Sequence, residues 1–206
     1  MNRLAHLAIA IALTTAAAAP VRAAAAGDFF PLAVGNWWKY RWTAGEKTEE
    51  FTVTVQRTET AGNGTVLFVL ETQSSSPMVQ WYAKQDGWVE MWRTAYPKKN
   101  MSGEFKPAKR SIQNPLTAGA RWEWKGEGLK GGPTEEANIV VGPEAVKVPS
   151  GSYDAMRVEV ASILGSSTVK KTHWFADGVG LVRSKTDTGK AESALELVEF
   201  NVGAAH

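Results

Sequence analysis

The chain has 206 residues with 23 basic and 21 acidic side chains, and it contains no cysteine. This near-neutral charge gives no electrostatic argument for nucleic-acid binding, and the composition excludes disulfides and cysteine-based metal sites. The length suits one sizeable domain, which can bury a hydrophobic core without covalent cross-links.

The first 23 residues have the features of a secretory signal peptide. Arg3 supplies a positive start, residues 4–19 form an apolar run too short for a comfortable membrane span, and Ala23 ends a small-x-small cleavage pattern. We expect cleavage after about Ala23 and release to the periplasm or the medium, with no lipoprotein anchor because no cysteine follows. Removal of Arg3 and Arg22 takes the formal charge from +2 to zero. No later apolar run is long enough for a transmembrane helix.

The mature chain, 24–206, alternates between apolar and polar residues at period two. Trp38, Tyr40 and Trp42 share one face of the first such run. Further runs rich in β-branched and aromatic residues occupy 51–56, 121–125, 156–160 and 195–197. Residues 66–70 are apolar on both faces, which predicts a strand covered on both sides.

Tight-turn dipeptides separate these runs. Asn63-Gly64, Asp86-Gly87 and Asp177-Gly178 each stand between two strand-like segments, and such pairs tolerate the positive φ angles of hairpin turns. We therefore predict an all-β domain, a curved antiparallel meander of about eleven strands that forms a half-barrel or a barrel-like sheet. A sandwich has the same period and turns. An outer-membrane barrel shares the aromatic strands, but residues 66–70 lack its alternation.

The longest irregular stretch, 96–114, is predicted to be a basic loop. Its charged residues are Lys98, Lys99, Lys106, Lys109 and Arg110, against the single acid Glu104. Such a loop usually stays solvated, and it is also a candidate for contact with an acidic surface or a protein partner.

The chain repeats parts of its own sequence. PLAVGNWWKY at 31–40 resembles PLTAGARWEW at 115–124. In the same order along the chain, QWYA at 80–83 resembles HWFA at 173–176, and an Asp-Gly pair follows each of these two shorter segments. We therefore expect the domain to consist of two repeated units, 31–95 and 115–190, which loop 96–114 joins. Two small sheets of this kind can bury each other's apolar face.

Aromatic residues present in only one unit are the candidates for a binding site. Trp88, Glu90 and Trp92 are expected on one face of one strand, and Trp42 has Gly126 as its counterpart. We select Trp88, Glu90, Trp92 and Trp42 as candidate ligand-binding residues. The alternative is that Trp88 and Trp92 pack under the long loop.

Catalytic and metal-binding patterns are weak. His173 is the only internal histidine after signal removal, no Gly-x-Ser-x-Gly motif is present, and a polar strand position explains the residue. The adjacent glutamates 49–50 and 135–136 point to opposite strand faces, and their position before strands suits exposure to solvent. We expect no enzyme activity, no metal and no cofactor.

Three segments resemble an uncharacterised family of exported bacterial β-rich proteins. They are FFPLAVGNWWKY near the mature start, VKVPSGSYDAMRVEV at 146–160 and HWFADGVGLVRS at 173–184. The resemblance implies a strongly curved sheet similar to the half-barrels of periplasmic lipoprotein carriers, without the helices that cover those carriers. It implies no catalytic or binding residue.

These features predict a non-enzymatic periplasmic or secreted binding protein for an apolar or amphiphilic ligand, such as a lipid, held against aromatic walls. One alternative is an envelope protein-interaction module that docks a protein partner through a sheet edge or the 96–114 loop. The other is a carbohydrate-binding module, which requires Trp88 and Trp92 to be exposed and coplanar.

Overall fold

The computed structural model describes residues 27–203, except 130–131 and 166. The predicted signal peptide, 1–23, lies outside the described residues. The described chain forms twelve strands and one short 3-10 turn. In chain order they are β1 (Trp37–Ala44), β2 (Lys47–Thr60), β3 (Val66–Gln73), β4 (Met78–Gln85), β5 (Trp88–Tyr96), η1 (Pro97–Lys99), β6 (Met101–Gln113), β7 (Arg121–Glu127), β8 (Pro133–Val148), β9 (Gly151–Leu164), β10 (Ser167–Ala176), β11 (Gly180–Asp187) and β12 (Glu192–Asn201).

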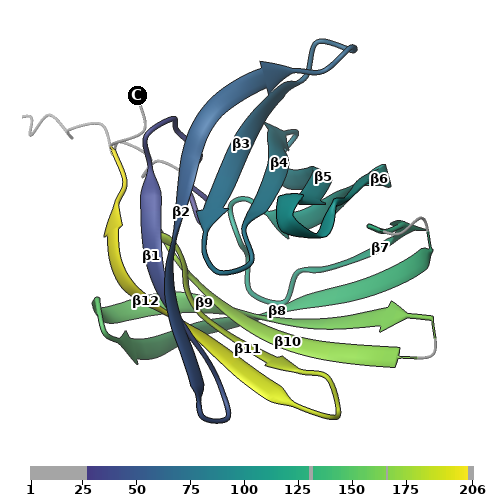
Figure 1. The fold of residues 1–206 in the computed structure, drawn as a ribbon. Helices are drawn as coiled ribbons and strands as arrows, with labels where there is room; N and C mark the ends of the chain where they lie inside the picture. Colours follow the sequence, from purple (N-terminus) through teal and green to yellow (C-terminus); the bar gives the residue numbers. More distant parts are fainter. Residues whose placement is uncertain (1–26, 130–131, 166, 204–206) are drawn as a thin grey trace, which may run out of the picture.

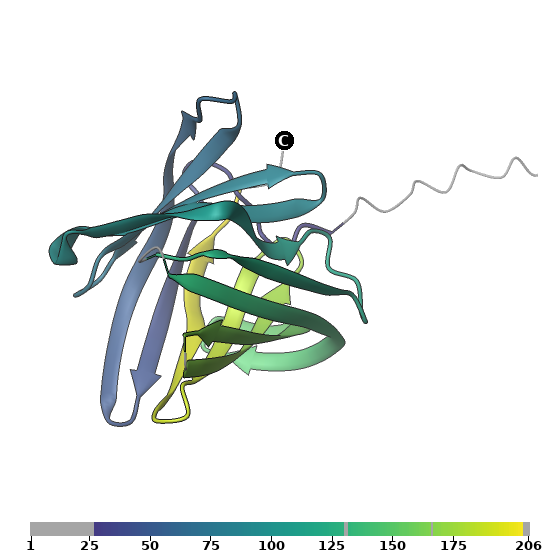
Figure 2. The ribbon, with the colours of Figure 1, turned by 90° about the vertical axis from the view of Figure 1, so that its right-hand side faces the viewer.

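The strands form a closed antiparallel barrel (Figures 1 and 2). Each strand pairs with its neighbours in the chain, and β1 pairs with β12 to close the ring. The predicted all-β antiparallel meander is confirmed, as a closed barrel rather than a half-barrel. No helix within the described ranges is long and apolar enough to cross a membrane.

The predicted loop 96–114 is the main error in the expected strand pattern. It contains η1 and the strand β6, which raises the strand count from about eleven to twelve. The register between β5 and β6 moves from Met91–Lys109 to Arg93–Glu104, so residues 105–108 have no partner on β5. A strand that is largely exposed and interrupted in this way has no period-two hydrophobic pattern to reveal it.

The first described segment closes one end of the barrel. The Asp28 carboxylate accepts hydrogen bonds from Lys84 Nζ at 2.6 Å and Asn114 Nδ2 at 2.9 Å. Its backbone oxygen accepts a hydrogen bond from Gly178 N at 2.9 Å. These partners lie at or beside three different turns at the same end, and Leu32 is buried in the core there. The segment therefore ties these turns together.

Inward-facing side chains of the strands make the core. Trp38 and Tyr40 of β1 are buried, in line with the predicted aromatic face. Trp38 Nε1 donates to Val179 O at 2.6 Å, and Tyr40 Oη donates to Leu181 O at 2.9 Å. These bonds satisfy the polar ends of two large buried rings and hold β1 against the start of β11. Burial raises the pKa of the Tyr40 hydroxyl, which stays protonated as the donor.

The barrel is most weakly paired between β6 and β7. A single residue pair, Lys106 with Glu127, joins these strands. The indole nitrogens of Trp122 and Trp124 donate to backbone oxygens of the β6 strand, each at 3.1 Å. A Cβ atom on Gly126 would lie 2.5 Å from Lys106 O, so the two backbones approach closely here. We call this contact the β6–β7 seam.

A second, smaller hydrophobic cluster lies on the outer face of β3 and β4. We name the buried residues Leu67, Val69, Trp81 and Ala83 the outer cluster. They face away from the barrel interior because their strand neighbours, including Leu70 and Tyr82, belong to the core. The predicted strand at 66–70 is thus covered on both faces.

Candidate functional site

The barrel holds a cavity of about 1050 Å³. Ligand pockets in proteins usually measure roughly 300–1,000 Å³, so this cavity has room for a sizeable ligand. Large apolar side chains form most of its wall. They include Trp38, Tyr40, Trp42, Phe51, Leu181 and Leu195.

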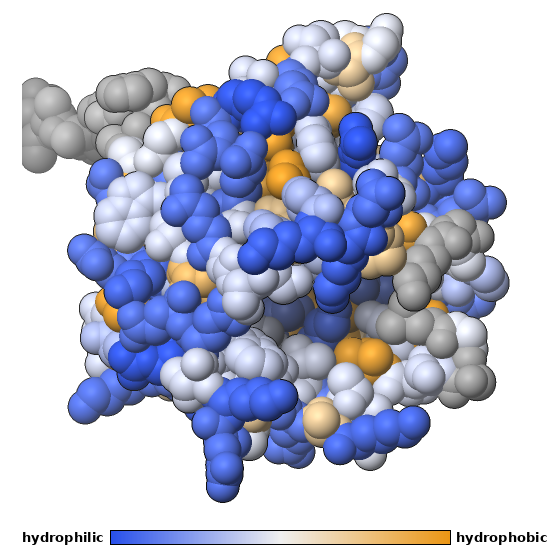
Figure 3. Space-filling model, viewed as in Figure 1, coloured by the Kyte–Doolittle hydropathy of each residue, from blue (hydrophilic) through white to orange (hydrophobic). Residues whose placement is uncertain are grey.

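The cavity runs from the closed end to the opposite end of the barrel. Phe30 and Pro31 of the closing segment line it at one end. Glu46 in the β1–β2 turn and Ser75 in the β3–β4 turn line it at the other. Figure 3 faces this second end and shows a recess between hydrophilic residues of the rim, with hydrophobic residues at its edge. A ligand would enter from this end.

One carboxylate links β2 to the β3–β4 turn at the open end. Glu49 accepts hydrogen bonds from the backbone nitrogen of Ser75 at 2.6 Å and from its hydroxyl at 2.8 Å. These two hydrogen bonds lower the pKa of Glu49, and the bond from the Ser75 backbone has the larger effect. The contact holds the β3–β4 turn to β2 at the mouth of the cavity.

A set of polar side chains also faces the barrel interior, on β6, β8, β9 and β10. We name it the inner polar cluster. Its members are Lys109, Glu136, Asn138, Ser162, Lys171 and His173. Lys109 Nζ lies 3.1 Å from Glu136 Oε2, and Ser162 Oγ donates to the same oxygen at 3.0 Å. The strand register places Asn138, Val160 and Lys171 in one row across β8, β9 and β10.

Burial and mutual charge set the protonation states of this cluster. Burial raises the pKa of Glu136, but Lys109, Lys171 and the Ser162 hydroxyl together outweigh that effect and hold the pKa below its usual range. Burial and, after it, the nearby charge of Lys171 lower the pKa of His173 to about 3. At neutral pH Glu136 is therefore ionised and His173 is neutral.

The four predicted site residues do not come together in one place. Trp42 lines the cavity, paired across the sheet with Leu195 and Glu49. Trp88 packs edge-on against Trp122 with ring centroids 5.7 Å apart, outside the set of residues that line the cavity. The structure therefore supports a cavity position for Trp42 alone among the four.

Glu90 is part of a polar network at the start of β5. Its carboxylate accepts a hydrogen bond from Gln85 Nε2 at 2.7 Å and lies 3.7 Å from Arg110 Nε. The Arg110 guanidinium also lies 4.8 Å from the Trp88 ring centroid. Arg110 thus contacts both Glu90 and Trp88. Packing is enough to explain this arrangement.

Trp92 packs against the outer cluster instead of the cavity. Trp88 instead packs against the barrel core beside Trp122. Both Trp88 and Trp92 are partly buried. The exposed pair required by the carbohydrate-binding alternative is therefore absent from the described structure.

Sequence reasoning missed the inner polar cluster. Glu135 and Glu136 were both expected at a solvated strand start, but only Glu135 is exposed, and Glu136 is buried. The available signal was the alternation of β8, in which Glu136, Asn138 and Val140 must share one face. A polar pair on the face of a buried valine indicates a polar site inside a barrel.

Comparison with known proteins shows a structural likeness only. No family model matches the chain, and no curated protein matches it. A solved protein described as a "putative lipoprotein" from Parabacteroides distasonis is 16% identical, with a TM-score of 0.52 over 85% of this chain and 99% of that chain. A protein from Bacteroides fragilis, described as a "putative exported protein with YmcC-like fold", is 16% identical, with a TM-score of 0.47 over the same shares. The first of these likenesses indicates a shared fold.

Proposed function

We propose that this protein is an exported, non-enzymatic binding protein that holds an apolar or amphiphilic ligand inside its barrel. The observation that carries the proposal is the cavity of about 1050 Å³, walled by aromatic and aliphatic side chains and lined by the closing segment at one end. Burial of an apolar ligand against such walls is driven by the hydrophobic effect.

Selection for folding stability alone would not maintain an empty cavity of this size. Unfilled volume in a core costs roughly 24 cal/mol per Å³ where packing could otherwise fill it. The chain nevertheless places the smaller Leu181 and Leu195 beside the rings of Tyr40 and Trp42 in the cavity wall. A barrel selected for stability alone would fill this region with larger side chains.

Export is supported by two independent observations. Residues 1–23 carry the signal-peptide pattern. The solved protein from Parabacteroides distasonis that shares the fold is described as a "putative lipoprotein", and lipoproteins are exported. This chain has no cysteine, so we propose release after cleavage rather than a lipid anchor.

Native mass spectrometry of the protein purified from the periplasm or medium of its source, followed by solvent extraction, tests the proposal. We expect a retained apolar adduct that the solvent removes. A clean mass with nothing extractable, together with no binding of added lipids, would overturn it.

Two variants make this measurement specific to the cavity. Leu195→Trp introduces a large ring into the cavity and should remove the adduct. Val141→Trp places the same ring on an exposed position, 43% accessible, and should keep it. An adduct that survives Leu195→Trp would be bound elsewhere on the surface.

A protein-interaction function has one observation in its favour. The β6–β7 seam has a single residue pair, so most backbone groups of β7 lack a ladder partner on that side, and a strand of a partner could add there. Deuterium exchange of β7 amides in envelope extract would reveal it: protection that appears only with extract indicates a strand-adding partner.

A further inference from the structure

The inner polar cluster carries one more cation than anion. It contains the ammonium groups of Lys109 and Lys171 and the single carboxylate of Glu136. Lys109 and Ser162 already occupy that carboxylate through hydrogen bonds. Lys171 acts on it through charge alone, without a hydrogen bond.

Burial makes this excess charge costly. The pKa of Lys171 is lowered by burial and by the neighbouring Lys109, and only Glu136 opposes the shift. An ammonium group that lacks a close counter-ion in such a place is stabilised by any anion that reaches it.

Further polar groups beside Lys171 lack partners. Both amide atoms of Asn138 are buried and have no hydrogen-bond partner among the described residues, and the same holds for Nδ1 of His173. Asn138 is only 5% exposed. It stands in one row with Lys171, with Val160 between them. Native proteins rarely leave such groups unsatisfied, and the row presents a donor amide and a cation on the same inner face of the sheet, two strands apart.

The cluster and the apolar cavity both face the barrel interior, and Tyr82 stands between them. Tyr82 lines the cavity, whereas the residues of the cluster do not. Burial raises the pKa of the Tyr82 hydroxyl, and the neighbouring Tyr96 and Glu136 raise it too, which places Glu136 near this ring. The head group of a ligand in the cavity would reach the cluster past Tyr82.

We propose that the ligand is an amphiphile with an anionic head group, carboxylate or phosphate, that contacts Lys171 and Asn138 while its hydrocarbon tail fills the aromatic cavity. This inference rests on the proposed function and names its ligand class. Lys171 supplies the charge, and the Asn138 amide donates a hydrogen bond to a head-group oxygen. Tail burial supplies most of the binding free energy.

Four probes with sixteen carbons in the chain test the head group: palmitate, hexadecyl phosphate, hexadecanol and hexadecyltrimethylammonium. Each is titrated below its micelle concentration by calorimetry into protein that has been extracted with solvent. We expect one or both anionic probes to bind about tenfold more tightly than hexadecanol, as a charge-assisted hydrogen bond allows, and the cationic probe to bind most weakly. The ratio between palmitate and the phosphate identifies the preferred anion.

Lys171→Met removes the charge but keeps the length of the side chain. It should abolish the preference for anionic probes and leave hexadecanol affinity within about twofold, because the tail contacts are unchanged. Lys170→Met is the matched control, since its neighbour Lys170 is exposed, and it should keep the wild-type preference.

The outcomes separate this inference from the proposed function. Equal affinity for palmitate, phosphate and hexadecanol in the wild-type protein would overturn the anionic head group while supporting an apolar site. Absence of binding for all four probes would overturn both. An anionic preference that persists in Lys171→Met would refute the assignment of the head group to this cluster. The comparison of the four probes in the wild-type protein tests the anionic head group even if the Lys171→Met variant fails to fold.

Discussion

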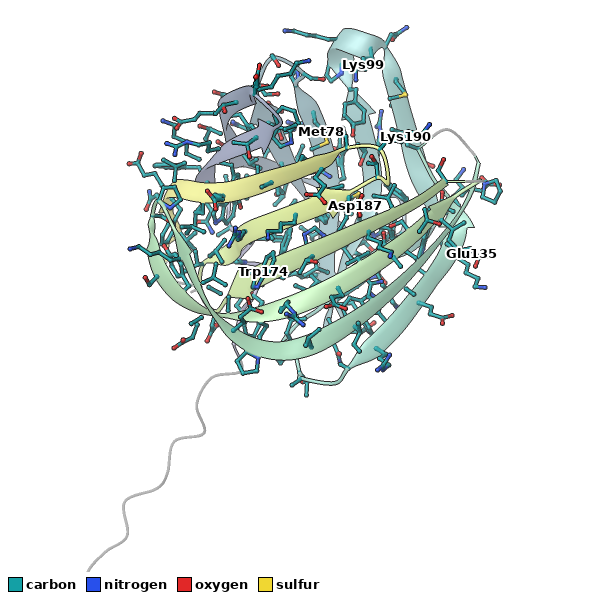
Figure 4. All side chains as sticks on the ribbon, turned by 90° about the horizontal axis from the view of Figure 1, so that it is seen from below. Met78, Lys99, Glu135, Trp174, Asp187 and Lys190 are labelled. Carbon is teal, nitrogen blue, oxygen red and sulfur yellow. The ribbon has the colours of Figure 1, made fainter. Side chains whose placement is uncertain are left out.

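At the scale of single residues, adjacent glutamates on β8 should differ sharply in their effect on stability. Glu136 is buried with Lys109, whereas Glu135 pairs with Lys125 at 3.0 Å on the surface, and Figure 4 labels Glu135 pointing away from the barrel. Glu136→Gln leaves buried lysines without a counter-ion and should lower the unfolding free energy by about 3 kcal/mol. Glu135→Gln should change it by less than about 1 kcal/mol.

Urea unfolding monitored by tryptophan fluorescence provides this comparison. Equal losses for the two variants would mean that Glu136 is solvated, and the inner polar cluster would then not be a buried site. Alternation along β8 separates the two glutamates, because it puts Glu136 on the face of Asn138 and Val140. Pairing with Trp124 of β7 then turns that face inward.

His173 should make the protein less stable in mild acid. Its folded pKa of about 3 lies below the ordinary value, so below about pH 6.5 the unfolded chain takes up a proton that the folded chain does not. The unfolding free energy should fall by roughly 2 kcal/mol from pH 7 to pH 5 through this group. Lys171, Glu136 and Lys109 are the charged groups that act on the ring.

The variant His173→Gln isolates that effect, because Gln80 occupies the corresponding place in QWYA. Urea midpoints at pH 7, 6 and 5 should decline less steeply for the variant than for the wild-type protein. Parallel declines would assign the acid sensitivity to other groups.

At the scale of strands, indole hydrogen bonds should hold the β6–β7 seam. Trp122→Phe and Trp124→Phe keep aromatic bulk but remove the N–H donors to the β6 backbone. Each should cost about 1 kcal/mol and speed amide exchange in β6 and β7 more than in the β8–β9 pair. Trp88→Phe is the control, because Trp88 packs edge-on against Trp122 and is not one of the two indole donors to the β6 backbone. Uniform faster exchange across all strands would indicate general loss of packing instead.

Strand identity was predictable where burial alternates and not where bulges intervene. The aromatic face of β1 and the turn at Asp86-Gly87, where both residues have positive φ, follow from local residue chemistry. The pairing of β5 does not, because its register with β6 shifts between Val89 and Glu90 and again between Met91 and Arg93. Register depends on the partner strand, which no local pattern contains.

The predicted sequence repeat, 31–95 and 115–190, falls on β1–β5 and β7–β11. Two local features recur between them. The register shifts between Trp81 and Tyr82 on β4 and between Trp174 and Phe175 on β10. Arg93 and Arg183 lie over the Trp81 and Trp174 rings, at 4.6 and 5.5 Å. We retain duplication as a prediction on these grounds, and β6 and β12 would then be equivalent sixth strands.

At the scale of the whole molecule, closure and cavity are linked. The closing segment ties the turns of one end through Asp28, while Glu49 of β2 holds the β3–β4 turn at the other. The barrel wall between them does not collapse onto the cavity, because strand tilt and stagger fix the diameter of a closed barrel once its strand number is set. The side chains therefore determine how much of the interior stays empty.

This arrangement predicts a trade between stability and binding at Leu195. A ring placed there by Leu195→Trp can occupy empty volume beside Trp42. The unfolding free energy of the ligand-free protein should therefore rise by about 1 kcal/mol. The affinity for the sixteen-carbon probes should fall more than tenfold. Ligand at about 100 times its dissociation constant should stabilise the wild-type protein by about 2.7 kcal/mol and the variant hardly at all. Thermal unfolding with and without palmitate measures both effects. A variant that is destabilised yet still binds would mean that the cavity is already filled by packing in solution, and that the ligand site must lie elsewhere.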